Sequence, residues 1–469
     1  MIFRVPDDAL AAAHGLRSAD IVLGIPSYQN AHTIAHVVRA AHAGLAKYFP
    51  QFTSVIVNSD GGSTDGTREA ALSTRVEDCH VLLLSHPLAP VHRLSFPYHG
   101  IPGKGSAFRL VFSLASLLGA KACAVVDADL RSITPEWVDL LLRPILHADF
   151  DFVAPYYHRH KYDGTITNSI VYPLTRALYG LRVRQPIGGD FGVSGALLNR
   201  YLARDDWDTD VARYGIDVWM TTIAICEGFR VCQSFLGAKL HDAKDPGADL
   251  SAMLHQVVGS VFQLMSEYEG RWREQSGSRP VDLFGFRYDV GLDPVNVDVE
   301  RMLNLFRKGA RELDEIWSAA LAPATRADIA LVARDTQSAS FHLPDDLWVR
   351  VVYDFACACR RGALDRGHLL RSLTPLYLAR VASFVIETAR LTSDEVDQKI
   401  EALCLRYEEL KPYLISNWRY RHDGDHPGRA GAPHATGQER PAPADRGSGD
   451  LAGRAAAGDG GPLADRESV

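Results

Sequence analysis

Two acidic residues, Asp127 and Asp129, lie two positions apart directly after the apolar run at residues 122–126. In an extended chain such residues project to the same side, and their carboxylates repel each other unless a cation lies beside them. Oxygen ligands of this kind suit Mg²⁺ or Mn²⁺, whose remaining positions can be filled by diphosphate oxygens and water. The pair therefore predicts a divalent metal site. The structural alternative is a solvated turn before a helix that begins near Pro135.

Two glycine-rich segments supply groups that suit a nucleotide. Asp60 opens one of them (residues 60–67, Asp-Gly-Gly-Ser-Thr-Asp-Gly-Thr), and Lys104 lies between two glycines in the other (residues 102–105). Glycines let the backbone approach a ligand closely, and Asp60 can accept hydrogen bonds from a base or a ribose. Lys104 adds a mobile cation at the start of a predicted helix, where amide groups and the helix dipole also favour a diphosphate. Each segment could instead be an ordinary turn, the first one capping the helix that follows.

These residues need a scaffold whose strands end at one edge. From Asp20 onward, apolar and partly β-branched runs alternate with helical stretches at residues 33–47 and 106–118. The apolar runs are residues 21–28, 53–60, 80–86, 122–129 and 150–157. This alternation predicts an α/β fold with a mostly parallel, Rossmann-like sheet that helices cover on both faces. Ligands of open α/β sheets bind where the strands end, which is where the acidic and glycine-rich segments lie.

The rest of the chain differs in composition. Beyond about Leu250, apolar residues three and four positions apart predict a series of amphipathic helices. These helices are expected at residues 253–272, 299–321, 347–362 and 378–390. From Asp423 onward the chain is rich in small and polar residues and has no aromatic residue, so it cannot bury enough apolar surface to order itself. We predict an α/β domain over residues 1–249, a helical region over residues 250–422 and a disordered tail over residues 423–469.

Composition limits the classes of ligand and location. The net charge of −7 gives no general attraction to nucleic acid or to an anionic membrane, so a phosphate-bearing ligand needs local cations, amides or a metal. Seven cysteines without a Cys-x-x-Cys pair fit no disulfide framework or zinc site. The first residues show no signal-peptide pattern, and the best apolar run, residues 110–120, is shorter than the about 20 residues of a membrane-spanning helix. We expect a soluble, cytoplasmic protein.

Taken together, the motifs resemble those of the GT-A glycosyltransferases. The segments at residues 21–30, 59–67, 100–108 and 125–130 occur in the order and spacing of that family. Further segments at residues 185–191, 214–217 and 239–241 extend the series. The whole series is similar to the glucosyl-3-phosphoglycerate synthase and mannosylglycerate synthase group, over about residues 20–263.

The resemblance implies a site for a nucleotide-diphosphate sugar. The base would lie in a pocket at residues 26–28, next to Asn30, where members of the group often carry an acid; whether the donor is UDP- or GDP-linked is therefore left open. Asp60 would contact the nucleoside and Lys104 the diphosphate. The implied donor-binding residues are Pro26, Ser27, Tyr28, Asn30, Asp60, Lys104, Asp127, Ala128 and Gly189.

The resemblance also implies a metal centre and a mechanism. His241 is similar to the histidine that completes the metal shell beside Asp127 and Asp129. Lys104, Asp190 and Asp217 would be the catalytic residues. Members of the group retain the anomeric configuration, by a front-side displacement in which the departing diphosphate helps to deprotonate the acceptor. No side-chain nucleophile is then required, and Mg²⁺ or Mn²⁺ is the implied cofactor.

The acceptor is indicated more weakly. Arg159, Lys161 and Thr165 resemble an acceptor loop in their spacing. Cations and a hydroxyl there could bind a small acid such as glycerate or 3-phosphoglycerate, although a solvated basic turn fits the same residues. We expect no nucleic-acid partner and no membrane span, and a homodimer is left open.

Three other functions remain compatible with the sequence. An inverting transferase that builds polysaccharide or glycolipid would need a carboxylate base opposite the leaving group, and Asp190 or Asp217 could be that base. A non-catalytic binder of nucleotide sugars would keep the same binding residues. A nucleotidyltransferase could also use paired acids and a lysine on a similar sheet.

Overall fold

An eight-stranded sheet is the centre of the fold in the computed structural model, which describes residues 4–74, 91–97, 103–240, 251–288, 295–335, 337–362 and 364–418. The strands lie in the order β10-β8-β5-β7-β4-β1-β2-β3. Their bounds are Ile21–Ser27 (β1), Ser54–Asp60 (β2), Val91–Pro97 (β3), Ala122–Val125 (β4), Phe152–His158 (β5), Phe191–Ser194 (β7), Val231–Ala238 (β8) and Leu283–Phe284 (β10). A short second sheet pairs β6 (Leu181–Arg182) with β9 (Arg279–Pro280).

The large sheet is mostly parallel, as the alternation of strands and helices predicts. Every pair of neighbouring strands is parallel except those of β7, which runs antiparallel to both β4 and β5. A reversed strand begins at the edge where its neighbours end. The segment that precedes β7 therefore arrives at the same edge as the segments that follow β1, β4, β5 and β8.

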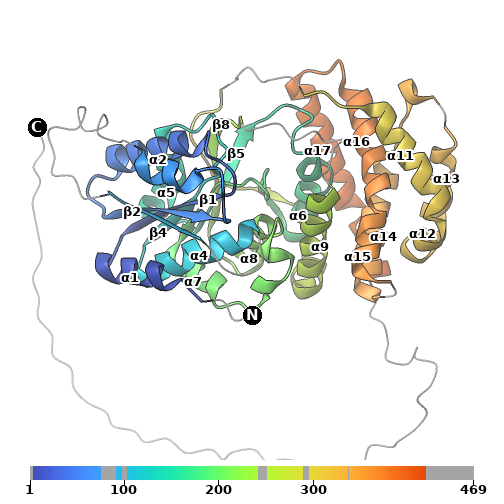
Figure 1. Cartoon of the computed structure of the whole chain (residues 1–469). Coiled ribbons are helices and arrows are strands. Elements are labelled where there is room, and N and C mark those ends of the chain that lie inside the picture. The colour runs from blue at the N-terminus through green and yellow to red at the C-terminus, as the bar shows by residue number, and fades with distance from the viewer. Residues whose placement is uncertain are drawn as a thin grey trace, which may run out of the picture. The chain divides into compact units, whose positions relative to one another are not determined.

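Helices cover both faces of the sheet (Figure 1). Alternate residues of β1 enter different cores: Ile21 and Leu23 pack with residues of α2 and α5, and Val22 packs with residues of α4 on the other face. This alternation is the two-residue period of a strand that is buried on both sides. The helices of this part are α1 (Asp7–Leu16), α2 (Ile34–Tyr48), α3 (Thr67–Ser73), α4 (Lys104–Leu117), α5 (Pro135–Ala148), α6 (Tyr172–Tyr179), α7 (Gly195–Leu202) and α8 (Ile216–Cys226).

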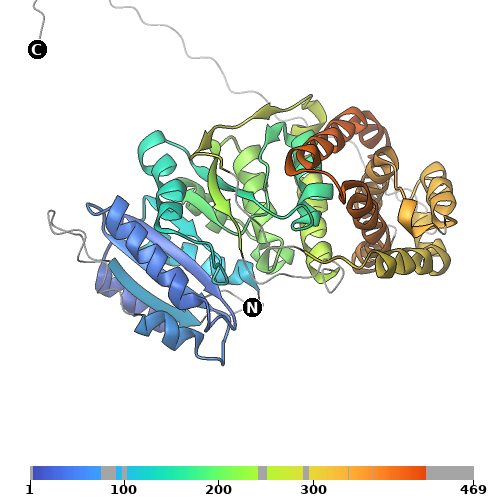
Figure 2. The same cartoon turned by 90° about the horizontal axis from the view of Figure 1, so that it is seen from above.

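A group of helices follows, and Figures 1 and 2 show it to one side of the sheet, next to α6. Its members are α9 (Ser251–Glu267), α10 (Glu269–Glu274), α11 (Val299–Glu312), α12 (Asp314–Ala320), α13 (Pro323–Ala333), α14 (Asp345–Arg361), α15 (Arg366–Ser372), α16 (Thr374–Thr388), α17 (Ser393–Glu409) and α18 (Lys411–Asn417). The buried Arg176 of α6 joins the two groups through Glu401 and Glu408 of α17, at 2.5 and 2.7 Å. Trp348 of α14 adds a hydrogen bond of 2.8 Å to the carbonyl of Ser169.

By their contacts, residues 1–421 form one compact unit, so the boundary near residue 250 stays a prediction. The expected strand at residues 80–86 and the expected disordered tail lie outside the described residues. One helical stretch of the described part, Arg366–Thr388, is long and apolar enough to cross a membrane, but 78% of its apolar window is buried inside the protein. A core helix passes the same test, so this stretch is weak evidence for a membrane span.

Candidate functional site

A cavity of about 880 Å³ opens at the edge of the sheet where the parallel strands end. Its wall is built from the ends of β1, β4 and β8, the loop after β5, the turn before β7 and the first turns of α4 and α9. Ligand pockets for small molecules and cofactors have volumes of roughly 300–1,000 Å³. Most of the residues predicted to bind a nucleotide sugar line it, namely Pro26, Ser27, Tyr28, Asn30, Lys104, Asp127, Ala128 and Gly189.

Asp127 is held between two lysines in the wall of this cavity. The Nζ atom of Lys104 lies 2.8 Å from Oδ1 of Asp127, and the Nζ atom of Lys239 lies 2.7 Å from Oδ2. Lys239 also pairs with Asp190 at 2.8 Å and donates a hydrogen bond of 2.7 Å to the carbonyl of Gly188. Two ammonium groups therefore lie at the same sheet edge, one on each side of a single carboxylate.

These groups keep their charges although burial favours their neutral forms, because each lies beside a group of opposite charge. Burial acts to lower the pKa of Lys104, but the attraction of Asp127 and Asp217 raises this pKa well above its ordinary value. The pKa of Lys239 is raised against burial in the same way, by Asp127 and Asp190. For Asp127, burial acts to raise the pKa, and the two lysines lower it well below its usual range. At neutral pH both lysines and Asp127 are consequently charged.

Asp190 lies behind the wall of the cavity and is fully buried. One of its oxygens accepts a hydrogen bond of 2.8 Å from the backbone N–H of Asp127, and the other contacts Lys239 and the hydroxyl of Tyr157. Burial raises the pKa of Asp190, and the attraction of Lys239 opposes this rise. Both oxygens have protein partners, so this position favours a role in holding Asp127 and Lys239. The catalytic role that the resemblance implies for Asp190 stays a prediction.

Glycines before β7 allow this close packing. Gly189 has φ of +94°, and a Cβ atom there would lie 2.1 Å from Oδ2 of Asp127 and 2.8 Å from Nζ of Lys239. Gly105 of α4 is constrained in another way, because a Cβ atom would lie 1.8 Å from the carbonyl oxygen of Val211. The glycines that the sequence singles out are thus needed for the contacts of the protein with itself, as well as for room beside a ligand.

Asp60 shapes the turn beside the predicted base pocket. It is fully buried and does not line the cavity. Its carboxylate accepts hydrogen bonds from the N–H groups of Gly62 and Ser63, at 3.0 and 2.8 Å, and from the hydroxyls of Ser27 and Ser63, at 3.0 and 2.6 Å. With these four bonds, the carboxylate fixes the turn that carries Gly61 and Gly62 into the cavity wall. Its contact with a nucleoside stays a prediction.

Asp129 is the carboxylate that best suits a metal ion. It lines the cavity, it is half-buried, and it has no hydrogen-bond or ion-pair partner among the residues that the structure describes. No group of three metal-ligating side chains occurs within the described ranges, and His241 lies outside them. Mg²⁺ commonly binds to only one or two carboxylates and takes its other ligands from substrate phosphates and water. The described residues therefore fit a metal that arrives with a diphosphate.

Asp217 projects into the cavity from the first turn of α8. Its Oδ1 atom is buried without a hydrogen-bond partner and lies 3.5 Å from Nζ of Lys104. Burial raises the pKa of Asp217 and outweighs the attraction of Lys104. A buried acceptor that no described residue hydrogen-bonds is costly, so this oxygen is suited to accept a hydrogen bond from a bound hydroxyl.

The three predicted acceptor residues differ in their contacts. Arg159 lines the cavity and pairs with Asp163 at 3.6 Å. Lys161 instead donates hydrogen bonds of 2.6, 3.2 and 3.2 Å to the carbonyls of Thr388, Ala389 and Leu391, at the C-terminal end of α16. Thr165 also lines the cavity, but its hydroxyl shares a hydrogen bond of 2.5 Å with Tyr377. Of the three, Arg159 has the position that best suits an acceptor.

Lys239 and Tyr157 were not selected as site residues from the sequence. Lys239 lies beside His241 in the segment at residues 239–241 and directly follows the apolar strand β8. A lysine at the end of a buried strand is the signal that would have identified it. Tyr157 carries no comparable signal, because an aromatic residue within a strand is ordinary core.

Comparisons with known proteins give structural similarity only. No family model and no curated protein matches the chain. Solved structures of glucosyl-3-phosphoglycerate synthase from Mycobacterium tuberculosis are similar to it. The complex with Mn²⁺, UDP-glucose and phosphoglyceric acid is 21% identical with a TM-score of 0.39, over 55% of this chain and 83% of that chain. The complex with Mg²⁺ and UDP is 22% identical with a TM-score of 0.39, over the same shares of the two chains.

Proposed function

We propose that the chain is a metal-dependent, retaining glycosyltransferase. It moves a hexose from a UDP- or GDP-linked sugar to a small acidic acceptor such as glycerate or 3-phosphoglycerate. The observation that carries the proposal is the pair of ammonium groups, Lys104 and Lys239, on either side of Asp127 in a cavity of about 880 Å³. This volume suits a nucleotide sugar, and the two cations suit its diphosphate.

In this proposal, each part of the donor contacts a different part of the cavity wall. The base and ribose lie against the end of β1, between Tyr28 at the rim and the glycine turn that Asp60 fixes. The diphosphate lies beside Lys104, at the N-terminus of α4, where the helix dipole adds to the charge of the ammonium group. The sugar lies toward Gly189 and Asp217. Oδ1 of Asp217, which has no hydrogen bond from a described residue, accepts one from a sugar hydroxyl.

Transfer breaks the bond between the anomeric carbon and a diphosphate oxygen. The acceptor oxygen bonds to the same face of the carbon, and the acceptor proton passes to the departing diphosphate. Negative charge grows on that diphosphate as the sugar becomes oxocarbenium-like, and Lys104 and Lys239 stabilise this charge because both are held in their charged form. Asp190 and Tyr157 keep Lys239 in position.

A divalent metal would be held by Asp129, together with His241 and Asp127 where the resemblance puts them. When bound, Mg²⁺ or Mn²⁺ would neutralise charge on the diphosphate and orient it. The carboxylate of Asp129 supports this assignment, because no described residue pairs with it. Both oxygens of Asp127 contact lysines, so its part in holding the metal would require one of these contacts to lengthen.

The configuration of the product distinguishes this proposal from an inverting transferase. Inversion requires a carboxylate base in the cavity. Asp190 does not line the cavity, whereas Asp217 does and has a raised pKa. A product with the anomeric configuration of the donor supports retention, and a product with the opposite configuration would make Asp217 the base of an inverting enzyme.

The proposal is tested by a donor-by-acceptor transfer screen with Mg²⁺ and with Mn²⁺. Thermal-shift measurements with UDP and with GDP come first and indicate which nucleotide the donor carries. A ligand that binds only the folded state raises the stability of the protein. Metal-dependent formation of a glycoside supports the proposal. Binding of a nucleoside diphosphate without transfer to any acceptor would indicate a non-catalytic binder, and release of pyrophosphate from a nucleoside triphosphate would indicate a nucleotidyltransferase.

The metal site has a test of its own that does not require turnover. We expect Asp129→Ala and His241→Ala each to abolish the metal-dependent part of nucleotide binding in calorimetry, because each removes a ligand. Far-UV circular dichroism checks that the fold survives. The control is Asp328→Ala, at a half-buried aspartate whose carboxylate pairs with Arg350 on the helical side. Unchanged nucleotide affinity in both site variants would defeat the assignment.

A further inference from the structure

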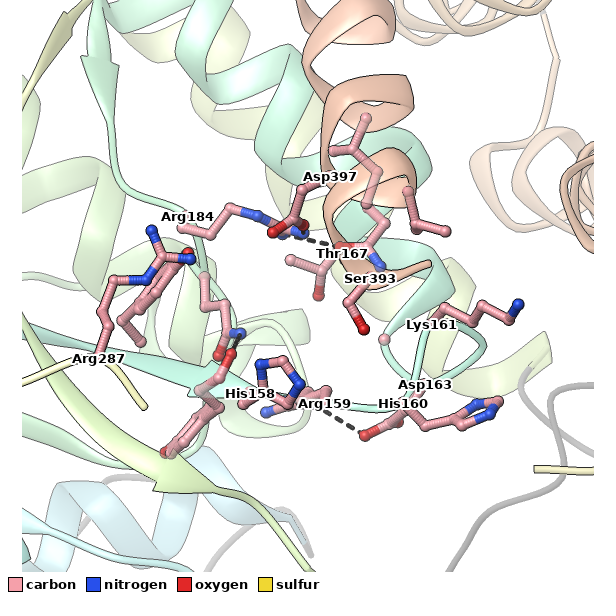
Figure 3. Close-up of a pocket in the computed structure, with 17 residues that line it drawn as sticks. His158, Arg159, His160, Lys161, Asp163, Thr167, Arg184, Arg287, Ser393 and Asp397 are labelled. Atoms are coloured by element: carbon pink, nitrogen blue, oxygen red, sulfur yellow. Dashed lines mark hydrogen bonds and ion pairs between the residues drawn. The ribbon is translucent and has the colours of Figure 1, made fainter. Parts of the chain in front are cut away.

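A second, smaller pocket lies beside the cavity, between the loop after β5 and helix α17 (Figure 3). We call it the side pocket. It is lined chiefly by His158, Thr167, Arg184, Gln185, Arg287 and Ser393. Its volume is about 70 Å³, and a water molecule needs about 10–15 Å³ on this measure. The side pocket therefore has room for a group the size of a phosphate or a carboxylate, and not for a whole sugar.

Positive charge exceeds negative charge around the side pocket. Arg184 pairs with Asp397 at 3.5 Å, on the first turns of α17. Arg287 has no carboxylate partner among the described residues, and its guanidinium group lies over the ring of Tyr156, 5.0 Å from the centroid. Arg159 contributes a third guanidinium group, which is paired with Asp163 at 3.6 Å. Three guanidinium groups thus face two carboxylates, and the exposed Arg287 supplies the excess.

Neutral hydrogen-bonding groups also face this space. The hydroxyls of Thr167 and Ser393 lie between Arg184 and the Arg159–Asp163 pair, whereas Lys161 points away (Figure 3). Ser393 is the first residue of α17, a helix of 17 residues, whose dipole is positive at this end. An anion here would accept hydrogen bonds from hydroxyl and guanidinium groups at once.

Gln185 adds a specific acceptor. The residue is 6% exposed, and its buried Oε1 atom has no hydrogen-bond partner in the described part of the chain. Its Nε2 atom donates a hydrogen bond of 3.2 Å to the carbonyl of Tyr157, which fixes the orientation of the amide. The free Oε1 atom requires a donor, and a phosphate that still carries one proton, or the hydroxyl of a hydroxy acid, supplies one.

We propose that the side pocket is a binding site for a small oxyanion, namely a phosphate or carboxylate group that also offers a hydroxyl. Arg184 and Arg287 balance its charge, Thr167 and Ser393 donate hydrogen bonds, and Gln185 accepts one. Arg159, Asp163, Gly164 and Thr167 line both the side pocket and the main cavity. An anion held here would therefore lie next to the loop that borders the proposed transfer site.

The test is calorimetry with inorganic phosphate on the full chain without nucleotide. We expect phosphate to bind the wild-type protein, and Arg287→Gln to weaken binding at least fivefold. Arg184→Gln should weaken it as well, but Arg184 also contacts Asn168 and Tyr172, so the exposed Arg287 gives the cleaner result. Asp397→Asn should strengthen binding about two- to fivefold, because it removes the exposed carboxylate that competes for Arg184. The control is Arg334→Gln. Arg334 is the exposed C-cap residue of α13 and forms no ion pair with any described residue.

Sulfate tests the role of Gln185. It is similar to hydrogen phosphate in size and charge but has no proton to donate, so we expect sulfate to bind at least several-fold more weakly. Equal binding of phosphate by the wild-type, Arg287→Gln and Asp397→Asn proteins, or no binding by any of them, would overturn the proposal. Equal binding of sulfate and phosphate would overturn the assignment of Gln185.

The oxyanion can belong to the acceptor or be a separate ion, and kinetics distinguish these sources. If it belongs to the acceptor, phosphate competes with the acceptor, and Arg287→Gln raises the acceptor KM without changing kcat. If it is separate, phosphate changes the rate without competing. Only this distinction rests on the proposed transferase function. Phosphate binding with the expected variants but without transfer would refute the function and leave the oxyanion site standing.

Discussion

At the scale of single residues, the site depends on which buried charges have partners. Lys104 and Lys239 each pair with Asp127, at 2.8 and 2.7 Å. Oδ1 of Asp217 lies 3.5 Å from Nζ of Lys104 but is buried without a hydrogen bond from any described residue. A buried acceptor without a hydrogen bond costs stability. Natural sites accept such costs where function needs the group, and Asp217 is one of the cavity residues that carry this cost.

We predict that Asp217→Asn trades activity for stability. The pKa of Asp217 is raised by burial, so ionising this carboxylate is harder in the folded protein than in the unfolded chain. The cost appears as the pH rises above the ordinary value of about 3.9, and it amounts to about 1.4 kcal/mol for each pH unit of the rise in pKa. The variant should therefore unfold at a higher temperature than the wild type at pH 7, with no advantage below about pH 3.9.

Thermal melts across pH 3 to 8 check this sign. Transfer assays should show a loss of activity, because the neutral amide cannot take a proton and accepts a weaker hydrogen bond than a carboxylate. A loss of about 100-fold or more is expected where Asp217 acts as a base. A variant that is less stable than the wild type at pH 7 would contradict the account of Asp217.

Gly189→Ala should damage the site by collision as well as by backbone strain. The left-handed φ of Gly189 costs about 1–2 kcal/mol for any other residue, and a Cβ atom would also meet Asp127 at 2.1 Å. Gly119→Ala is the matched control, because Gly119 has φ of +67° but no atom within 4 Å of a Cβ atom. We expect both variants to lose stability in urea unfolding and Gly189→Ala alone to lose nucleotide affinity. Equal nucleotide affinity in the two variants would show that Asp127 moves away from the added Cβ atom without harm to the site.

At the scale of elements, the reversed strand β7 explains how the site is assembled. Because β7 is antiparallel to β4 and β5, its start brings Gly188, Gly189 and Asp190 to the edge where the other strands end. The loop after β5 runs in the other direction: it leaves this edge of the sheet and reaches the helical region. Its anchor there is Lys161, which bonds to three carbonyls at the end of α16.

We predict that Lys161→Met weakens this anchor and leaves catalysis largely intact. The ammonium group of Lys161 caps the C-terminal end of α16, where a cation is favoured by the helix dipole, and charged hydrogen bonds contribute about 1.5–3 kcal/mol. Urea unfolding should show a loss of this size. Lys308→Met is the control, because Lys308 is 60% exposed with a partner 3.9 Å away, and should change stability by less than about 0.5 kcal/mol. A large rise in acceptor KM without a stability loss would instead make Lys161 an acceptor residue.

At the scale of the whole molecule, one hydrophobic core is shared by the sheet and the helical region. The same core contains Val22 and Val55 from the sheet, and Trp348, Tyr377 and Leu403 from the helices. The pairs of the buried Arg176 with Glu401 and Glu408 cross the same boundary. If the two parts separated, each would expose a large apolar surface to water, which is unfavourable.

We therefore expect residues 4–418 to unfold in a single transition. Urea unfolding followed by far-UV circular dichroism reports the helices, and near-UV circular dichroism reports the packing of the aromatic residues in the core. Coincident midpoints from the two signals are the expected result. Two separated midpoints would mean that the predicted boundary near residue 250 divides units that unfold independently.

The sequence by itself determined the class of fold and the edge where the site lies. The apolar runs that became β1, β2, β4 and β5, and the helices between them, are visible as local patterns, because burial of a strand or a helix face imposes its own period on the chain. The acidic and glycine-rich segments follow these runs directly. The order of these segments along the chain therefore implies that they meet at one edge of a parallel sheet.

Only the tertiary structure decided which of these residues face the cavity and which support it. Lys239 meets Asp127 across 112 positions of chain, Asp60 and Asp190 lie behind the wall, and Lys161 is bonded to a helix more than 200 positions away. Partners of this kind depend on register, on the direction of β7 and on the packing of the helical region. A period in the sequence specifies which face of an element is buried, and it carries no information about which distant side chain satisfies a given charge.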